Sequence, residues 1–497
     1  MRLFHGLQSG RQWFAFFFLM TVWIILQAKA PAQVTLTQIS SDPYTVPPGQ
    51  HATEVEPHVL ANGSTLVAAF QVGRIAPGGA TDIGWATSTD GGSTWTHGFL
   101  PGLTTGEGSG PYSAASDPAV AYDAAHNVWM IASLPIGDFQ TPAVVVSRSL
   151  DGGFTWQNPV SVDAKAASSD KNWIVCDSNS GSPFYGHCYV EWDNPAAGDE
   201  ILMSTSTDGG QTWGAAIATA NRSIGIGGQP LVQPNGTVIV PIEITGQSAF
   251  TSTNGGASWS KPVTIAGIQT HADAGGIRSG PLPSAAMDGA GTVYVVWEDC
   301  RFRSNCSTND LVYSTSTDGT HWTAVKRVPI DATTSTTDHF IPGIGIDPAT
   351  SGSSAHIAIH YYFYPKSSCS QSTCQLYVGY ISSPNGGSTW GKPVKLAGPM
   401  QLSWLPNSQN GLMVGDYIAT AFNNGVPHGV FAVAAAKSGS TYNEPTDTAQ
   451  GLTIATAEEA TLSSAADKPL HHLSDPIEKE PAEKGIHPPE RKRSAKK

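Results

Sequence analysis

Carboxylate, arginine and aromatic residues stand at the ends of several short apolar runs in this chain, and such side chains together suit a sugar-like ligand. Carboxylates can act as general acid and base, aromatic rings offer flat apolar surfaces, and arginine can hold a carboxylate through two hydrogen bonds. One group begins or precedes an apolar run: Glu56, Asp117, Trp173, Arg278, Asp338, Asp416 and Tyr417. A second group follows such a run: Arg74, Glu243, Glu298 and Arg301. Each could instead bond neighbouring backbone groups, so its role depends on the strands that position it.

An eight-residue motif divides the chain into intervals. STDGGSTW (88–95) is followed by SLDGGFTW (149–156), STDGGQTW (206–213), STNGGASW (252–259), STDGTHW (316–322) and SPNGGSTW (383–390). The Asp or Asn side chain can accept backbone N–H bonds within a turn, and the glycines adopt conformations barred to other residues. Six ordered copies are explained by folding rather than by catalysis, so each interval is interpreted as one supersecondary unit.

Each interval repeats the same order of segments. An extended segment such as LPSAAMDG (282–289) leads through a turn into an alternating run such as TVYVVWE (292–298), then a variable loop, a short strand, the motif and a last strand. This order predicts an all-β propeller of four-stranded antiparallel blades. Two further strands are expected within 411–436, and 33–40 could add an outer strand. We therefore expect seven blades with the ring closed by N- and C-terminal strands, six being the alternative.

The pattern S-x-D-x-G-x-T-W resembles the Asp box of the sialidase superfamily, also called the BNR repeat. In that superfamily the boxes are structural and lie away from the active site. Three arginines there clamp the substrate carboxylate, a tyrosine paired with a glutamate is the nucleophile, and an aspartate is the acid/base. The resemblance implies these catalytic residues here: Tyr417 as nucleophile, Glu298 or Glu243 as its partner, and Asp117 as acid/base.

Strand direction assigns these residues to one face. If the first strand of each blade runs from top to bottom, the boxes between third and fourth strands lie at the bottom. The starts of first strands and the ends of second strands then meet at the top, where we expect the ligand. The expected substrate-binding residues are Arg278, Arg301, Arg74, Glu56, Asp416, Asp338 and Trp173.

The chain departs from the family at the arginine clamp. The first arginine is expected within V-E-P-H (55–58), where Glu56 stands, and no arginine occurs between Arg327 and Arg491. Lysine could replace one arginine as a point charge but not as a bidentate fork. The sequence thus predicts a sialidase-like propeller acting on a glycan or glycoconjugate. An exo-glycosidase of exo-α-sialidase type with a Tyr nucleophile is one form, and a non-catalytic carbohydrate- or protein-binding scaffold is the alternative.

The two ends differ from the repeats. Arg2, Arg11, the apolar run 13–26 and Ala30-Pro31-Ala32 predict a signal peptide over 1–32 and a secreted, periplasmic or extracellular location. The apolar run is short for a membrane span of about 20 residues, although an uncleaved anchor is the alternative. We expect the propeller over 33–437 and a disordered charged tail over 438–497, which holds few large apolar residues.

The cysteines form three close pairs, and the net charge is −13. In an exported chain the pairs predict the disulfides Cys176–Cys188, Cys300–Cys306 and Cys369–Cys374, with zinc binding as the alternative. The acidic balance argues against nucleic acid as a partner. No metal motif or cofactor motif occurs, and acidic loops could bind calcium although no spacing identifies a site.

Overall fold

The computed structural model describes residues 34–106, 109–137, 141–163 and 168–470, and the signal peptide expected over 1–32 lies outside this range. The described part is built of antiparallel β-sheets, as the predicted all-β class requires. Its helices are five three-residue 3-10 turns: η1 (Pro195–Ala197), η2 (Ala274–Gly276), η3 (Ser304–Cys306), η4 (Gly352–Ser354) and η5 (Leu402–Trp404). No helix among these residues is long and apolar enough to cross a membrane.

The first eight-stranded sheet consists of two groups of four strands that are joined through a single residue pair, Ala80 with Ala115. The first group is β2 (Gln50–Asn62), β3 (Thr65–Arg74), β4 (Ala80–Ser88) and β5 (Thr96–Phe99). The second group is β6 (Ala114–Asp123), β7 (Val128–Ile136), β8 (Val145–Ser149) and β9 (Val160–Ser161). Both groups follow the strand order predicted for one interval of the sequence.

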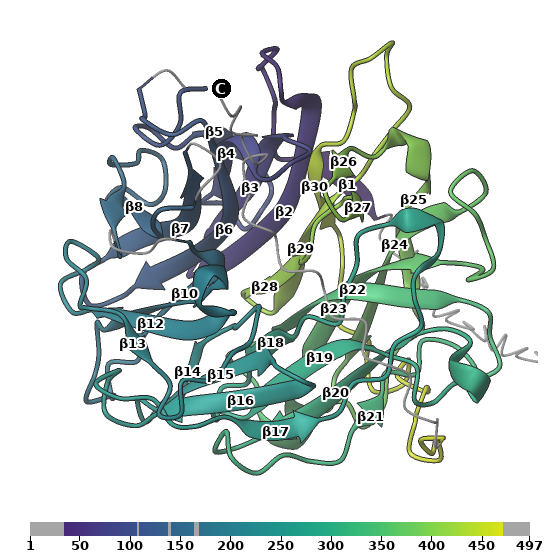
Figure 1. The fold of residues 1–497 in the computed structure, drawn as a ribbon. Helices are drawn as coiled ribbons and strands as arrows, with labels where there is room; N and C mark the ends of the chain where they lie inside the picture. Colours follow the sequence, from purple (N-terminus) through teal and green to yellow (C-terminus); the bar gives the residue numbers. More distant parts are fainter. Residues whose placement is uncertain (1–33, 107–108, 138–140, 164–167, 471–497) are drawn as a thin grey trace, which may run out of the picture. The chain divides into compact units, whose positions relative to one another are not determined.

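Four further sheets repeat this order along the chain. The first of them consists of β10 (Asp170–Cys176), β11 (Cys188–Asn194), β12 (Glu200–Ser206) and β13 (Ile217–Ala218). The second consists of β14 (Leu231–Val232), β15 (Val238–Glu243), β16 (Gln247–Ser252) and β17 (Val263–Ala266). The next are β18 (Ser284–Met287), β19 (Val293–Asp299), β20 (Asp310–Ser316) and β21 (Lys326–Arg327), then β22 (Asp338–Ile346), β23 (Ile357–Tyr364), β24 (Gln375–Ser383) and β25 (Val394–Gln401). Figure 1 shows the sheets arranged around a common centre, with the first strand of each nearest to it.

The final sheet combines both ends of the described chain. Its order is β28 (Ala419–Asn423), β29 (Val426–Ala432), β30 (Thr446–Gln450) and β1 (Thr35–Gln38), so β1 forms the outer strand. The short hairpin of β26 (Asn407–Ser408) and β27 (Gly411–Leu412) precedes it. The domain boundary expected at residue 437 is therefore wrong, because folded structure continues beyond it, through β30. The TDTAQ sequence of β30 has no large apolar residue, and its order comes from pairing with β1 and β29 on either side.

Each of the six motif copies forms the turn between the third and fourth strands of its group. In the first copy, Asp90 Oδ1 accepts hydrogen bonds from Thr94 N at 2.9 Å and Ser88 Oγ at 2.8 Å, and Asp90 Oδ2 accepts one from Thr94 Oγ1 at 2.7 Å. The bonds from Thr94 and Ser88 lower the pKa of Asp90 to about 2. Asn254 accepts the same backbone bond from Ser258 N at 3.0 Å, so the motif requires an acceptor oxygen and not a charge.

The core lies in layers between neighbouring sheets. One layer joins β6–β8 to β10 and β11, and the buried Met130, Val146 and Trp192 belong to it. The next joins β11 and β12 to β15 and β16 around Met203, Phe250 and the motif tryptophan Trp259. Face-to-face packing of sheets explains why the strands are apolar on both sides and why no single central core forms.

All three predicted disulfides are present, and the alternative of zinc binding by these cysteines is wrong. Cys176–Cys188 ties β10 to β11, and the other two bridges close short loops after β19 and β23.

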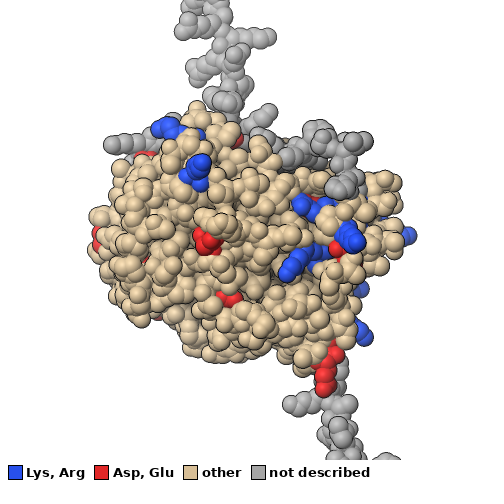
Figure 2. Space-filling view, turned by 90° about the horizontal axis from the view of Figure 1, so that it is seen from below, with Lys and Arg blue, Asp and Glu red and all other residues tan. Residues whose placement is uncertain are grey.

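Charged side chains on the face drawn in Figure 2 are few and separated by uncharged surface. The described residues of that face therefore form no continuous basic area of the kind that binds nucleic acid.

Candidate functional site

Four of the innermost strands carry the same irregularity. The pairing of β2, β6, β10 and β22 with the next strand shifts register at Glu56, Asp117, Lys171 and Ile341. These residues have φ between 47° and 52°, a region that non-glycine residues rarely adopt and that costs on the order of 1–3 kcal/mol. The shared bulge turns the strand at one level of the molecule. It brings three charged residues, Glu56, Asp117 and Lys171, from three groups of four strands toward each other.

A buried ion cluster forms at that level. Asp416 Oδ1 accepts a hydrogen bond from Arg278 Nε at 2.5 Å, and Asp416 Oδ2 contacts both Arg278 Nη2 and Lys171 Nζ. These three side chains are at most 4% exposed. Burial would raise the pKa of Asp416, but the positive charges of Arg278 and Lys171 outweigh burial and hold that pKa well below its usual range. Asp416 is thus paired with both cations of this cluster.

Carboxylates surround this cluster. Asp117 Oδ2 accepts a bond from Lys171 N at 3.1 Å, and Asp117 Oδ1 accepts one from Ser116 Oγ at 2.6 Å. Burial, together with the negative charges of Asp117 and Asp416, raises the pKa of Glu56 well above its ordinary value. The raised pKa favours the neutral acid form of Glu56, so this side chain offers no charge that could hold a carboxylate.

Arg74 is engaged by the protein itself. Its Nη1 donates to Gln71 Oε1 at 3.1 Å and to Gly79 O at 2.7 Å, and its side chain is fully buried. Gln71 in turn donates to Glu56 and to Ser116 Oγ. Arg74 and Glu56 are consequently joined through one glutamine. This chain of bonds holds β3 against the bulges of β2 and β6.

Tyr417 and Trp173 lie directly beneath the ion cluster. The Tyr417 hydroxyl donates to Pro118 O at 3.2 Å, and the two rings meet edge to face with centroids 5.1 Å apart. Trp173 also meets His58 edge to face at 4.5 Å. A void of about 10 Å³, room for one water molecule, is bordered by Lys171, Trp173 and Tyr417. The expected nucleophile is therefore buried under paired charges, at 7% exposure.

Arg301, the other arginine expected in the clamp, is bound elsewhere. It forms two hydrogen bonds with Asp299, from Nε to Oδ1 at 2.8 Å and from Nη2 to Oδ2 at 2.7 Å, and it also donates to Gly267 O. Its guanidinium lies 6.0 Å from the ring centroid of Trp297. These contacts order the turn after β19. Glu243 ends β15, where its backbone exchanges two hydrogen bonds with Ile226 and its side chain is buried.

A second cluster of polar side chains lies around Asp338 and Glu298, the remaining residues predicted for the site. His271 Nδ1 lies 3.0 Å from Asp338 Oδ2, and Asp338 Oδ1 accepts a bond from Asn309 N at 2.6 Å. Burial and the negative charges of Glu298 and Asp338 raise the pKa of the neighbouring Asp273. His271 and Asp273 were missed because they stand in a loop between strands. Their only sequence signal is the spacing H-A-D within a stretch assigned to variable loops.

A third group has a similar composition and a different charge balance. Asp310, Asp331 and His339 lie together, and two buried arginines contact both aspartates. Arg303 Nη2 donates to Asp310 Oδ1 at 2.5 Å and to Asp331 Oδ1 at 2.6 Å, while Arg327 approaches the same carboxylates at 2.8 and 2.7 Å. The group is electrically balanced. It ties β20 and β21 to the loop before β22.

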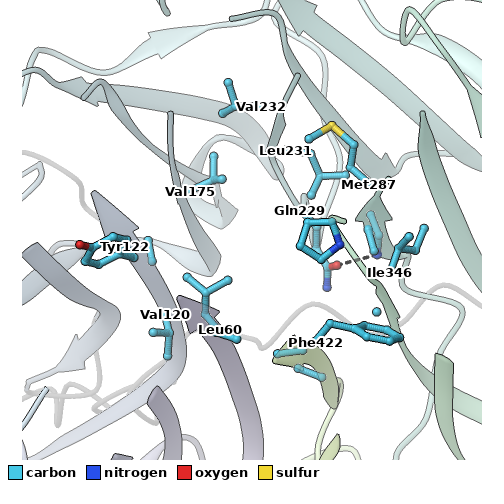
Figure 3. Close-up of a pocket in the computed structure, with 18 of the residues that line it drawn as sticks. Leu60, Val120, Tyr122, Val175, Gln229, Leu231, Val232, Met287, Ile346 and Phe422 are labelled. Carbon is cyan, nitrogen blue, oxygen red and sulfur yellow. Dashed lines mark hydrogen bonds between the residues drawn. The ribbon is translucent and has the colours of Figure 1, made fainter. Parts of the chain in front are cut away.

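A cavity of about 650 Å³ lies beyond the bulges, toward the C-terminal ends of the innermost strands (Figure 3). Its lining comes from the C-terminal parts of the innermost strands and from the turns that follow them, at the same end of the sheets as the motif turns. Aliphatic and aromatic side chains form the wall: Leu60, Val120, Tyr122, Val175, Leu231, Val232, Met287, Ile346 and Phe422. This cavity thus lies away from the face where the ligand was expected, and its wall is mainly apolar.

Two neutral donors reach the inner end of this cavity. His58 Nδ1 accepts a hydrogen bond from Val120 N at 2.8 Å, so the imidazole proton is assigned to Nε2. Burial lowers the pKa of His58 to about 3, which keeps the ring uncharged. Gln229 Oε1 accepts a bond from Ala285 N at 2.9 Å, which turns the amide NH₂ toward the cavity (Figure 3). The cavity therefore combines an apolar wall with hydrogen-bond donors at its inner end.

Comparisons with solved structures find similarity at low sequence identity. A protein of unknown function from Dyadobacter fermentans matches at 15% identity and TM-score 0.45, over 71% of this chain and 99% of that one. The NanB sialidase of Streptococcus pneumoniae matches at 14% identity and TM-score 0.41, over 83% of this chain and 70% of that one. An α-L-arabinanase of Penicillium chrysogenum matches at 15% identity and TM-score 0.43, over 83% of this chain and 97% of that one. No protein-family model matches the sequence, and neither does any curated protein.

Proposed function

We propose that this chain is a ligand-binding β-propeller of seven blades, exported to an oxidising compartment, and that it does not hydrolyse sialosides. The seven-blade count is supported by seven groups of four strands and by the contacts of β2 with both β6 and β28. The pairing of β1 with β30 supports closure of the ring by the two ends of the domain. The three disulfides support the oxidising compartment.

The state of the charged cluster argues against sialidase-type hydrolysis. A sialidase needs cationic groups that are open to the substrate carboxylate, but Arg278 is paired with Asp416 and buried. Displacing Asp416 would leave a buried carboxylate unpaired, which costs several kcal/mol. Glu56 supplies no positive charge where the family has its first arginine, because its raised pKa favours the neutral acid. An anionic sugar would therefore meet no free clamp.

One observation carries the binding proposal, namely the 650 Å³ cavity with an apolar wall and neutral donors at its inner end. Its volume and composition match those of small-molecule sites, which are mostly apolar with a few oriented polar groups. Polar side chains such as Asn62 and Asn179 stand at the turns of the rim. The ligand class that fits is an amphiphile whose apolar part enters the cavity and whose polar part stays at the rim. A glycoconjugate with an alkyl or aryl aglycone belongs to this class.

Calorimetric titration with n-octyl β-glucoside, below its micelle concentration, tests the proposal. Burying eight alkyl carbons contributes about 6 kcal/mol, and a dissociation constant on the order of 1 mM is expected once about 2 kcal/mol is lost to binding costs. Leu231→Asp places a carboxylate in the wall and should weaken binding at least about tenfold. Val394→Asp, at an outer strand where the side chain is 37% exposed, is the matched control and should bind as the parent does.

Two comparisons decide between the functions. Free glucose should not bind, whereas n-octanol should bind, because the alkyl chain supplies the affinity. Glucose binding as tight as that of the octyl glycoside would refute the cavity as the ligand site. Release of fluorophore from an aryl sialoside at any pH between 4 and 8, lost in Tyr417→Phe, would refute the non-catalytic function.

A further inference from the structure

We propose that His271, Asp273 and Asp338 form a binding site for one divalent transition metal ion, with zinc as the preferred ion. One ligand atom from each residue lies within 4.8 Å of the others. The site shares no residue with the lining of the apolar cavity or with the Arg278–Asp416 pair. It does not depend on the proposed ligand-binding function.

The ligand separation suits zinc. Imidazole nitrogen and carboxylate oxygen bind zinc at about 2.0–2.1 Å, so two such atoms in a tetrahedron stand about 3.3 Å apart. His271 Nδ1 and Asp338 Oδ2 are 3.0 Å apart, so both can face one ion after a small adjustment. Calcium prefers six to eight oxygen ligands, and an imidazole among three ligands argues for a transition metal instead.

The site has no arginine or lysine counterion within the part of the chain that the structure describes. Among the described residues, no lysine or arginine forms an ion pair with Asp273 or Asp338, and Asp338 is fully buried. The group of Asp310, Asp331 and His339 has the same residue types, but Arg303 and Arg327 neutralise it. Buried carboxylates without a cation are costly, and a metal ion supplies the charge that arginine supplies in the other group.

An unpartnered hydroxyl gives independent support. The Tyr364 side chain is fully buried, and its hydroxyl has no hydrogen-bond partner among the described residues. Tyr364 is the direct cross-strand partner of Asp338 in the pairing of β22 with β23, so the two residues lie side by side. Three protein ligands leave a fourth position on zinc for water, and the Tyr364 hydroxyl is the group that can hydrogen-bond to it.

The ligands are also held in place by outer contacts. Asn309 Oδ1 accepts from His271 N at 2.7 Å, and its Nδ2 donates to His271 O at 2.7 Å. Asn309 N donates to Asp338 Oδ1 at 2.6 Å, and Ser279 Oγ donates to Asp273 Oδ2 at 2.6 Å. Such bonds fix ligand orientation and leave the other carboxylate oxygen of Asp338 available.

The test is a zinc titration of the full-length protein, produced without a histidine tag and stripped with a chelator. One ion per chain is expected, together with the tetrahedral absorption bands of cobalt when Co²⁺ replaces Zn²⁺. Asp338→Asn and His271→Ala should each weaken zinc binding at least about 100-fold and abolish the cobalt bands. Since His271 is 26% exposed, His271→Ala should leave folding intact, which circular dichroism checks.

Asp331→Asn is the matched control, because it alters the arginine-balanced group and should leave zinc affinity unchanged. Zinc binding below one ion per chain would overturn the proposal. The proposal also fails if both ligand variants bind zinc as the parent does, or if calcium binds more tightly than zinc. Loss of zinc binding in Asp331→Asn alone would move the site to the other group and equally refute the assignment.

Discussion

Replacing Asp416 with asparagine is expected to destabilise the protein by about 3–5 kcal/mol, because two buried cations lose the carboxylate that neutralises them. Asparagine keeps the shape and one acceptor oxygen but removes the charge. Arg278 and Lys171 are 2% and 4% exposed, so water cannot replace it. The neighbouring Asp117 bonds the backbone of Lys171 and compensates the loss only in part.

Differential scanning calorimetry measures this effect. Unfolding a domain of roughly 430 residues carries an entropy of about 0.9 kcal/mol/K, so the midpoint should fall by about 3–5 °C. The lowered pKa of Asp416 means that its contribution is present above the ordinary value of 3.8 and is lost as the pH falls below it. The difference between parent and variant should therefore shrink only under strongly acidic conditions.

Asp90→Asn is the matched control, since Asn254 already makes the same turn bond with asparagine, and it should leave the midpoint nearly unchanged. Adding Lys171→Met to Asp416→Asn removes one unpaired cation and should recover part of the loss. A midpoint for Asp416→Asn within about 1 °C of the parent would refute the reasoning. It would mean that Arg278 and Lys171 are not held by Asp416 and that a cationic clamp is open to ligands.

Two further predictions concern stability. Burial raises the pKa of Glu54 to about 8, so the folded state holds this proton more tightly, and stability should fall by about 3 kcal/mol from pH 5.5 to 8. Thermal midpoints at the two pH values should show a smaller fall in Glu54→Gln, and an equal fall in both proteins would contradict the assignment. Gly256→Ala should lower the midpoint by several degrees, since its φ is 83° and the new Cβ would lie 2.2 Å from Thr205 Oγ1. Gly63→Ala meets no atom within 4 Å and should cost less, and the reverse order would refute the clash.

The sequence predicts the strands well because the motif is local. The turn needs only an acceptor, glycines and a hydroxyl within eight residues, so its copies mark the third and fourth strands without knowledge of the rest. The strand Thr446–Gln450 has no such marker, and its polar residues resemble a tail. It is ordered by partners from both ends of the chain, which composition does not reveal.

The candidate sites are less predictable because they depend on side-chain direction. Arg278 and Asp416 are both expected at one face, but a strand pattern does not disclose the bond between them, because both stand in segments outside the strands. The apolar cavity is hidden for another reason. Leu60, Val175 and Met287 resemble ordinary core residues, and only the arrangement around a common centre leaves them facing open space.

The pairing of Thr35 with Gln450 has a consequence for biosynthesis. Strand β1 is among the first parts of the domain to leave the ribosome and has no partner until β30 has been made. At about 5–20 residues per second, that interval lasts on the order of 20–80 s. During this time β1 is a solitary strand with free backbone groups, which in longer apolar segments invites misassembly between nascent chains. The four-residue, polar TLTQ sequence of β1 suits this wait, because it is too short and too hydrophilic to recruit a wrong partner.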